Sequence, residues 1–210
     1  MPNPSVSSLV DRISSAAPRC GDTRLVLIDG QAGAGKSTIA NRLAAALGGD
    51  ASGGAGTFLP DAELTEDDPV QIVHGDDLYE GWGGLATLDN VLLADILEPL
   101  AAGGTGVFQM WDWNEGRRSH TIRVPQRRVL IVEGVGVALP RARELAVLTM
   151  FASAPWETRL ARGLARDAHA YDDAVSLWEG FERDEQSHHA RTRAREDADV
   201  LLDGTQPIPE

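Results

Sequence analysis

The stretch GQAGAGKS, residues 30–37, carries the clearest chemistry in the sequence because it completes the pattern G-x-x-x-x-G-K-[ST]. Glycines allow the backbone N–H groups of such a loop to approach phosphate oxygens, and the N-terminus of a following helix favours anions. The lysine of the pattern reaches terminal phosphates, and its hydroxyl residue can ligate magnesium. The stretch therefore predicts nucleotide binding through Gly30, Gly33, Ala34, Gly35, Lys36, Ser37 and Thr38.

Lys36 is the only lysine among 19 lysine and arginine residues. Every other cationic side chain of this kind is an arginine, whose planar guanidinium differs from a compact ammonium beside phosphate. The single lysine at the position where the pattern needs one supports a phosphate-binding role for Lys36.

Carboxylates follow two short apolar runs that we expect to be buried strands. Asp76 and Asp77 follow residues 71–74 after one glycine, and Glu133 ends the run LIVE. Phosphoryl transfer to an alcohol needs a group that accepts the hydroxyl proton, and an acid beside the magnesium. We therefore expect Asp76 to act as the base and Ser37, Asp76 and Glu133 to organise the metal, although the spacing alone leaves Asp77 open as the base.

The segment ETRLARGLARD places Arg159, Arg162 and Arg166 three and four residues apart, on one face of a helix. Such arginines can neutralise charge that develops on a transferred phosphoryl group. The alternative is a solvated helix face on which Glu157 and Asp167 pair with the arginines.

The expected elements place these side chains at one edge of a sheet. Strands alternate with helices, which predicts an α/β fold with a parallel sheet covered on both faces and ligands at the carboxyl ends of its strands. We expect strands at 24–29, 71–74, 129–132, 146–151 and 200–202, a hairpin of 107–110 with 121–124, and helices at 6–17, 37–47, 88–102, 156–168 and 173–195. The glycine-rich segment 48–56 and the acidic segment 61–68 predict a loop.

Composition limits the class of protein. The 210 residues carry a formal net charge of −13, which disfavours nucleic acid and anionic membranes as partners. The one cysteine, Cys20, cannot form an internal disulfide, and neither a signal segment nor a membrane-spanning run is evident. We expect one cytoplasmic domain over residues 1–210 that acts on a small-molecule acceptor; its oligomeric state is not defined by the sequence.

Other classes with the same phosphate loop fit less well. A switch GTPase uses an [NT]-K-x-D segment to read guanine, and the chain has no second lysine. No segment resembles the LSGGQ sequence of transporter ATPases, and the acidic composition argues against a nucleic-acid motor. A small-molecule kinase fits best.

Six segments resemble the uridine kinase and phosphoribulokinase-like family, in the order seen there. They are GQAGAGKST, GDDLY, WDWNEGRRSH, VLIVEGVGVA, APWETRLARGLARD and EDADVLLDG, between residues 24 and 204. The resemblance implies a P-loop NTPase three-layer sandwich with a five-stranded parallel core sheet and a small lid and hairpin region. It also implies ATP and Mg²⁺ as cofactors.

The resemblance also assigns roles to individual residues. Asp76 matches the catalytic aspartate and Glu133 the acid of the magnesium shell, while Arg162 and Arg166 match arginines of the lid. The acceptor side is matched by Tyr79, Trp111 and Asp112, with Arg118 a further candidate there. The implied organisation is an accessory N-terminal helix within residues 1–23, an acceptor-side hairpin at about 103–127 and a lid at about 156–172.

Three departures from the family pattern concern the acceptor. Residues 81–90 lack the family's D-H-P segment, Gly116 stands where a histidine reads the pyrimidine, and AHAYDD replaces an arginine-containing lid loop. We therefore expect ATP-dependent phosphorylation of a hydroxyl on a nucleoside-like metabolite, with uridine a poor substrate. The alternatives are an accessory nucleotide-binding module with a decayed acceptor site and, because of Arg117 and Arg118, a nucleotide monophosphate kinase.

Overall fold

The computed structural model describes residues 2–57, 68–167 and 172–210. Its centre is a five-stranded sheet with the order β2-β5-β1-β6-β7, in which all neighbouring strands are parallel. The strands are β1 (Arg24–Gly30), β2 (Val70–His74), β5 (Val129–Glu133), β6 (Ala146–Ser153) and β7 (Val200–Asp203). The predicted five-stranded parallel α/β core is therefore confirmed.

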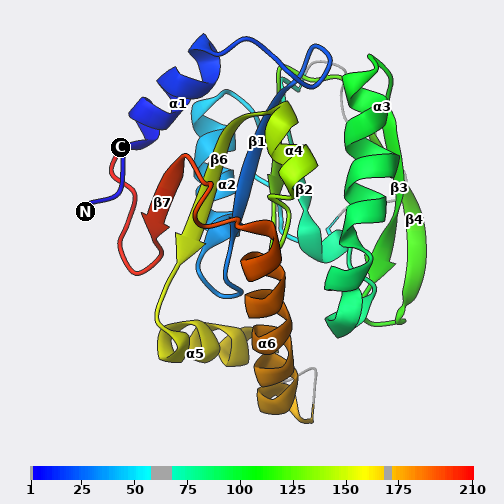
Figure 1. The fold of residues 1–210 in the computed structure, drawn as a ribbon, viewed down its shortest axis with the longest axis vertical. Helices are drawn as coiled ribbons and strands as arrows, with labels where there is room; N and C mark the ends of the chain where they lie inside the picture. The colour runs from blue at the N-terminus through cyan, green and yellow to red at the C-terminus, as the bar shows by residue number, and fades with distance from the viewer. Residues whose placement is uncertain (1, 58–67, 168–171) are drawn as a thin grey trace.

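The side chains of the central strand β1 alternate between two apolar cores, one on each face of the sheet. Val26 and Ile28 lie in the core that includes residues of α1 (Val6–Ser15) and α2 (Lys36–Ala46). Figure 1 shows α1 close to both chain termini, and the Val6 N–H donates to the Pro209 carbonyl at 2.8 Å. This face is therefore closed by the two N-terminal helices.

Leu25 and Leu27 of β1 lie in the second core, on the opposite face. This core includes residues of the helical segments η3 (Asn90–Leu97), α3 (Glu98–Ala101) and α4 (Pro140–Leu145), and of the antiparallel pair β3 (Gly106–Asp112) and β4 (Arg117–Val124). Figure 1 shows this hairpin and α3 on the far side of the sheet from α1. Helix, sheet and helix thus form three layers, and the predicted hairpin is present.

Two helices, α5 (Trp156–Asp167) and α6 (Ala174–Thr192), follow β6 and lie at the bottom in Figure 1. They pack closely at Gly163, where an added Cβ atom would lie 1.9 Å from the Trp178 ring. Asp173 caps the start of α6, and Arg193, with φ 54°, ends it in the left-handed region. Among the described helices, none has the length and apolar character needed to cross a bilayer.

The structure differs from the expected elements mainly in short helical segments. The helix expected at 88–102 has π-helical spacing over Asn90–Leu97 before α3, and Pro99 lacks the N–H that a regular α-helical pattern requires there. The turns η1 (Gly75–Asp77) and η2 (Gly81–Ala86), and the six-residue α4, are too short to show a helical period. Part of the loop expected at 61–68 and part of the lid expected at 156–172 lie outside the described residues.

Candidate phosphotransfer site

The phosphate loop connects the carboxyl end of β1 to the N-terminus of α2. Gly30 has φ 131°, and a Cβ atom there would lie 2.0 Å from the Ala152 carbonyl oxygen of the neighbouring strand. Gly35, with φ 94°, is the N-cap residue of α2. Only glycine tolerates such positions, so the loop's glycines are required by its path as well as by close approach of a ligand.

Lys36 folds back over this loop. Its Nζ donates to the carbonyl oxygens of Gly30 and Gln31, each at 3.0 Å, and the side chain is nearly buried. Ala34 is buried in the loop, whereas Ser37 and Thr38 are exposed at the start of α2. The ammonium and the positive end of the α2 dipole thus lie at the same loop, where both favour an anion.

Ser37, Glu133 and His74 form a hydrogen-bonded chain across the ends of β5 and β2. The Ser37 hydroxyl donates to Glu133 Oε1 at 3.0 Å, and the same oxygen lies 2.6 Å from His74 Nδ1. Burial acts to raise the pKa of Glu133, but the His74 contact and nearby Lys36 lower it overall. Burial acts to lower the pKa of His74, but the contact with Glu133 raises it overall. An ionised carboxylate beside a hydroxyl offers the hard oxygen donors that Mg²⁺ prefers.

Asp76 lies in η1, directly after β2, and is partly exposed. Burial of its carboxyl group and the charge of Glu133 raise the pKa of Asp76, while Arg166 and Lys36 oppose the rise. Asp76, Glu133, Lys36 and Arg166 are therefore close enough to interact electrostatically. Among the described residues, no group of three or more His, Cys, Asp and Glu side chains could hold a metal alone, so a magnesium ion would also need phosphate or water oxygens.

Asp77 has a different environment from Asp76. Its side chain is fully buried, and its Oδ1 accepts from the Gly56 N–H at 2.7 Å. Burial raises the pKa of Asp77 to about 7. The partly exposed Asp76 is thus the better placed of the two for contact with a ligand.

The three arginines of α5 do not share one environment. Arg166 is paired with Asp167 at 2.6 Å, and the charge of Asp76 also contributes to the rise in the pKa of Arg166. Arg162 donates to the carbonyl oxygens of Gly33 and Gly204, at 3.2 and 3.1 Å. Arg159 is 1% exposed and lies inside a hydrogen-bonded network with Glu182 and Glu185. Arg166 is thus an arginine of α5 whose charge interacts with that of Asp76.

The residues expected on the acceptor side lie near the hairpin, and polar groups of Tyr79 and Arg118 are engaged within the protein. Tyr79 is 1% exposed, and its hydroxyl donates to the Val135 carbonyl. Arg118 donates to the carbonyls of Gln109 and Leu78, at 2.9 Å each, and its guanidinium lies 5.8 Å from the centre of the partly exposed Trp111 ring.

Asp112 Oδ1 accepts from the amides of Asn114 and Glu115, at 2.9 and 3.0 Å, within the hairpin turn. Trp113, in contrast, donates from Nε1 to the Asp76 carbonyl at 2.8 Å. This contact joins the hairpin to the segment that carries the candidate base.

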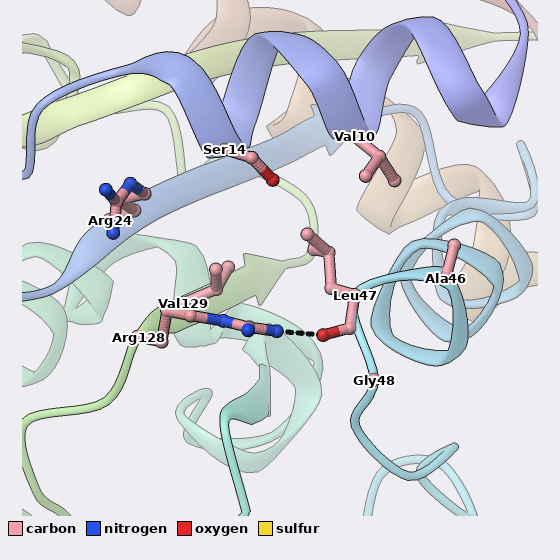
Figure 2. A pocket seen from close by; sticks show the side chains of 8 residues that line it. All are labelled: Val10, Ser14, Arg24, Ala46, Leu47, Gly48, Arg128 and Val129. Carbon is pink, nitrogen blue, oxygen red and sulfur yellow. Dashed lines mark hydrogen bonds between the residues drawn. The ribbon is translucent and has the colours of Figure 1, made fainter.

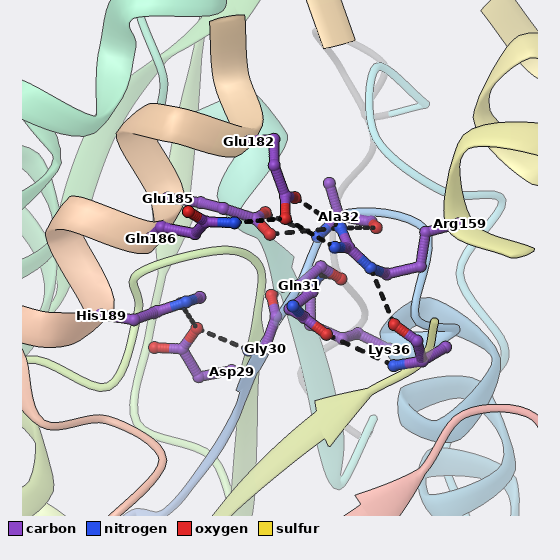
Figure 3. Close-up of polar contacts among 11 residues, drawn as sticks. Asp29, Gly30, Gln31, Ala32, Lys36, Arg159, Glu182, Glu185, Gln186 and His189 are labelled. Atoms are coloured by element: carbon purple, nitrogen blue, oxygen red, sulfur yellow. Dashed lines mark hydrogen bonds and ion pairs between the residues drawn. The ribbon is translucent and has the colours of Figure 1, made fainter. Parts of the chain in front are cut away.

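Two residues of this region were missed by the sequence analysis. Asp29 is fully buried and accepts from the amides of Gly136 and Ala138, both at 2.8 Å, and lies 3.0 Å from His189 Nε2. Figure 3 shows Asp29 and His189 beside the start of the phosphate loop. An acid at a strand end could have indicated Asp29, but no spacing in the sequence links it to His189 on α6.

A cavity of about 430 Å³ lies elsewhere, between α1 and the end of α2 (Figure 2). Arg24, which begins β1, and Arg128, which precedes β5, line it together with Leu47. It therefore lies at the amino ends of the strands, and it does not contain the phosphate loop.

Comparison with known proteins gives structural matches only. No family model matches the sequence, and no curated protein matches it. A structure from Bacillus stearothermophilus, described as that of a possible uridine kinase, has a TM-score of 0.58 and 17% identity over 94% of this chain and 97% of its own.

Two further structures cover 94% of this chain as well. A candidate fructose transport system kinase from Silicibacter sp. TM1040 has a TM-score of 0.55 and 22% identity over 98% of its own chain. YFH7 from Saccharomyces cerevisiae, described as a candidate P-loop kinase with a circular permutation, has a TM-score of 0.56 and 12% identity over 97% of its own. The chain therefore has the fold of P-loop kinases and resembles the uridine kinase-like and fructose transport kinase-like structures at low sequence identity.

Proposed function

We propose that this chain is an ATP-dependent kinase that transfers the γ-phosphate to a hydroxyl group of a small, nucleoside-like metabolite. The observation that carries the proposal is the geometry at the carboxyl end of the sheet, where Ser37 donates to Glu133 at 3.0 Å and Lys36 lies on the phosphate loop. Asp76 follows the neighbouring strand β2, and the charges of Glu133, Arg166 and Lys36 act on it. A candidate base, two cations and a candidate metal-shell acid at one phosphate loop are the parts that phosphoryl transfer requires.

Lys36 and the amides of residues 30–38 bind the triphosphate in this proposal. Lys36 exchanges its contacts with the Gly30 and Gln31 carbonyls for phosphate oxygens. Ser37, Asp76 and Glu133 would hold Mg²⁺, which when bound neutralises phosphate charge. His74 keeps Glu133 oriented through the 2.6 Å contact.

Asp76 accepts the proton of the acceptor hydroxyl. At the same time the hydroxyl oxygen forms a bond to the γ-phosphorus, and the bond between the γ-phosphorus and the oxygen that leaves with ADP breaks. Because the pKa of Asp76 is raised, its carboxylate is a better proton acceptor than that of an ordinary exposed aspartate. Arg166 faces the same region and stabilises charge on the transferred group, and Arg162 supports the loop from the Gly33 side.

The acceptor lies between η1 and the hairpin, where Trp111 and Asp112 come from β3 and Tyr79 follows η1. The net charge of −13 supports a small acceptor and argues against nucleic acid and anionic membranes. A cytoplasmic location is a prediction from the sequence.

One observation supports the accessory nucleotide-binding module as a second candidate. The polar groups of Tyr79, Asp112 and Arg118 are already bonded within the protein, so an acceptor must displace these bonds or use other groups. The bonds of Arg118 to the Gln109 and Leu78 carbonyls also make a nucleotide monophosphate kinase less favoured, because they occupy a cation that such an acceptor would use.

A screen of ATP consumption over nucleosides, sugars, vitamins and nucleotides separates these functions. The kinase predicts acceptor-dependent ADP formation that is lost in Lys36→Ala, with uridine not the best acceptor. Tight ATP binding without turnover on any acceptor supports the accessory module, and preference for a nucleoside monophosphate supports the third class.

A further inference from the structure

Arg159 connects the phosphate loop to three other elements of the fold. From α5, its guanidinium donates to Glu182 on α6 at 2.8 and 2.9 Å, and to Glu185 on the same helix at 3.2 Å. It also donates to the Ala32 carbonyl of the loop at 3.2 Å and to the Ala154 carbonyl after β6 at 3.0 Å. One buried side chain therefore ties α5, α6 and the loop together.

Glu185 makes the complementary contact to the same loop residue. Its Oε2 accepts from the Ala32 N–H at 2.8 Å, so Arg159 and Glu185 hold both backbone polar groups of Ala32 (Figure 3). The next residue, Gly33, has φ 76°, and a Cβ atom there would lie 2.7 Å from the Arg159 carbonyl oxygen. This part of the loop is thus packed directly on α5 and fixed by hydrogen bonds from both sides.

The charge of this cluster matters because it lies beside a loop expected to bind a polyanion. Two ionised carboxylates and one guanidinium would add a net negative charge next to the phosphates. Burial and a hydrogen bond with Glu182 raise the pKa of Glu185 to about 8, so near pH 7 Glu185 carries a proton and the three side chains together are neutral. A neutral cluster holds the loop without repelling its ligand.

We propose that Arg159 and Glu185 are positioning residues that fix the phosphate loop at Ala32 to α5 and α6. The inference rests on the proposed nucleotide-binding function. Neither side chain needs to touch the nucleotide, because each acts through the backbone of the loop. Since α5 also carries Arg162 and Arg166, the same contacts set the position of these arginines relative to the loop.

Equilibrium binding of MgATP to Glu185 variants tests the proposal. Glu185→Gln keeps an oxygen that can accept from the Ala32 N–H and resembles the protonated acid, whereas Glu185→Ala removes this acceptor. We expect Glu185→Ala to weaken MgATP binding by about 10-fold, as for the loss of one hydrogen bond, and Glu185→Gln to change it by less than about 3-fold. Asp197→Asn is the control, because it removes the charge of a carboxylate that lies 3.1 Å from Arg143, in a contact that does not involve the loop.

The pH dependence gives a readout that a purely structural role would not change. The charged and titratable groups that face Glu185 are Arg159 from α5, Glu182 from its own helix, Lys36 from the loop and Tyr79 after η1. Raising the pH from 7 to 9 ionises Glu185 in the wild type, so its MgATP affinity should fall several-fold more than that of Glu185→Gln over the same range.

Equal MgATP affinity of Glu185→Ala and Asp197→Asn, both folded by circular dichroism, would overturn the inference. If Glu185→Ala does not fold, the pH comparison decides, and an identical pH response of the wild type and Glu185→Gln overturns the inference. A wild type without Lys36-dependent MgATP binding contradicts the proposed function instead, so the two failures can be distinguished.

Discussion

Replacement of Asp29 by asparagine should destabilise the fold strongly, although it changes few atoms. The fully buried carboxylate joins β1 to residues 136–138, which follow β5, and to His189 of α6. Although burial acts in the other direction, His189 and the amides of Ala138 and Gly136 lower the pKa of Asp29. The native fold therefore depends on the ionised form.

The contacts give the expected magnitude. Oδ1 accepts from the amides of Gly30 and Gly136, and Oδ2 accepts from the Ala138 amide. An asparagine keeps one oxygen, so one charge-assisted hydrogen bond worth about 1.5–3 kcal/mol is lost and one buried donor is left unpaired at a cost of about 1–3 kcal/mol. We expect Asp29→Asn to lower the free energy of unfolding by about 2.5–6 kcal/mol at pH 7.

Urea unfolding measures the difference in the free energy of unfolding between the wild type and Asp29→Asn. The control is Asp22→Asn, which removes an exposed charge and should change stability by less than about 0.5 kcal/mol. Because the folded pKa of Asp29 is depressed, its contribution is present above the ordinary value of 3.8 and is lost as the pH falls through the folded pKa. The deficit of Asp29→Asn should therefore shrink below pH 4. A deficit under about 1 kcal/mol at pH 7, or one that does not change with pH, would refute the reasoning.

Three further predictions concern the site itself. Lys36→Ala should weaken MgATP binding by about 10-fold to 100-fold in equilibrium titrations while the circular dichroism spectrum is unchanged, because the ammonium faces the loop. Asp76→Asn should keep ATP binding but lose about 10²-fold or more in turnover, and Asp77→Asn should lose less; the reverse order in steady-state assays would make Asp77 the base. Asp112→Ala removes a cap of the hairpin turn, so thermal unfolding should report a loss of about 1 kcal/mol in the free energy of unfolding. Unaltered steady-state kinetics of this variant on the true acceptor would place the acceptor pocket elsewhere.

The existence and parallel direction of the core strands follow from local patterns in the sequence, whereas their order in the sheet was not predicted. Runs such as residues 129–132 are short, apolar and rich in β-branched residues, and they alternate with helical segments, so they predict a buried parallel sheet. The phosphate loop is equally local, because a single stretch of eight residues contains its turn glycines and its cation. Asp76 and Glu133 could be placed at one edge of the sheet because parallel strands share their carboxyl ends.

The contacts that join the helices to the site could not be predicted in this way. Glu185 lies 153 residues from Ala32, and the contact between them depends on how α6 packs beside the phosphate loop. The helical spacing of Arg159, Arg162 and Arg166 gave no sign that Arg159 is buried, because its partners come from α6 and the loop. Tyr79 is similar, since only the fold brings its hydroxyl to the Val135 carbonyl.

The most direct test of the proposed kinase is ³¹P nuclear magnetic resonance of a reaction that contains MgATP and each candidate acceptor. We predict that the γ-phosphorus signal is replaced by that of a phosphomonoester of the acceptor with wild-type protein, that uridine is not the best acceptor, and that Lys36→Ala forms no such product. Release of inorganic phosphate alone, or unchanged ATP with every acceptor despite tight MgATP binding, would contradict transfer to a hydroxyl group.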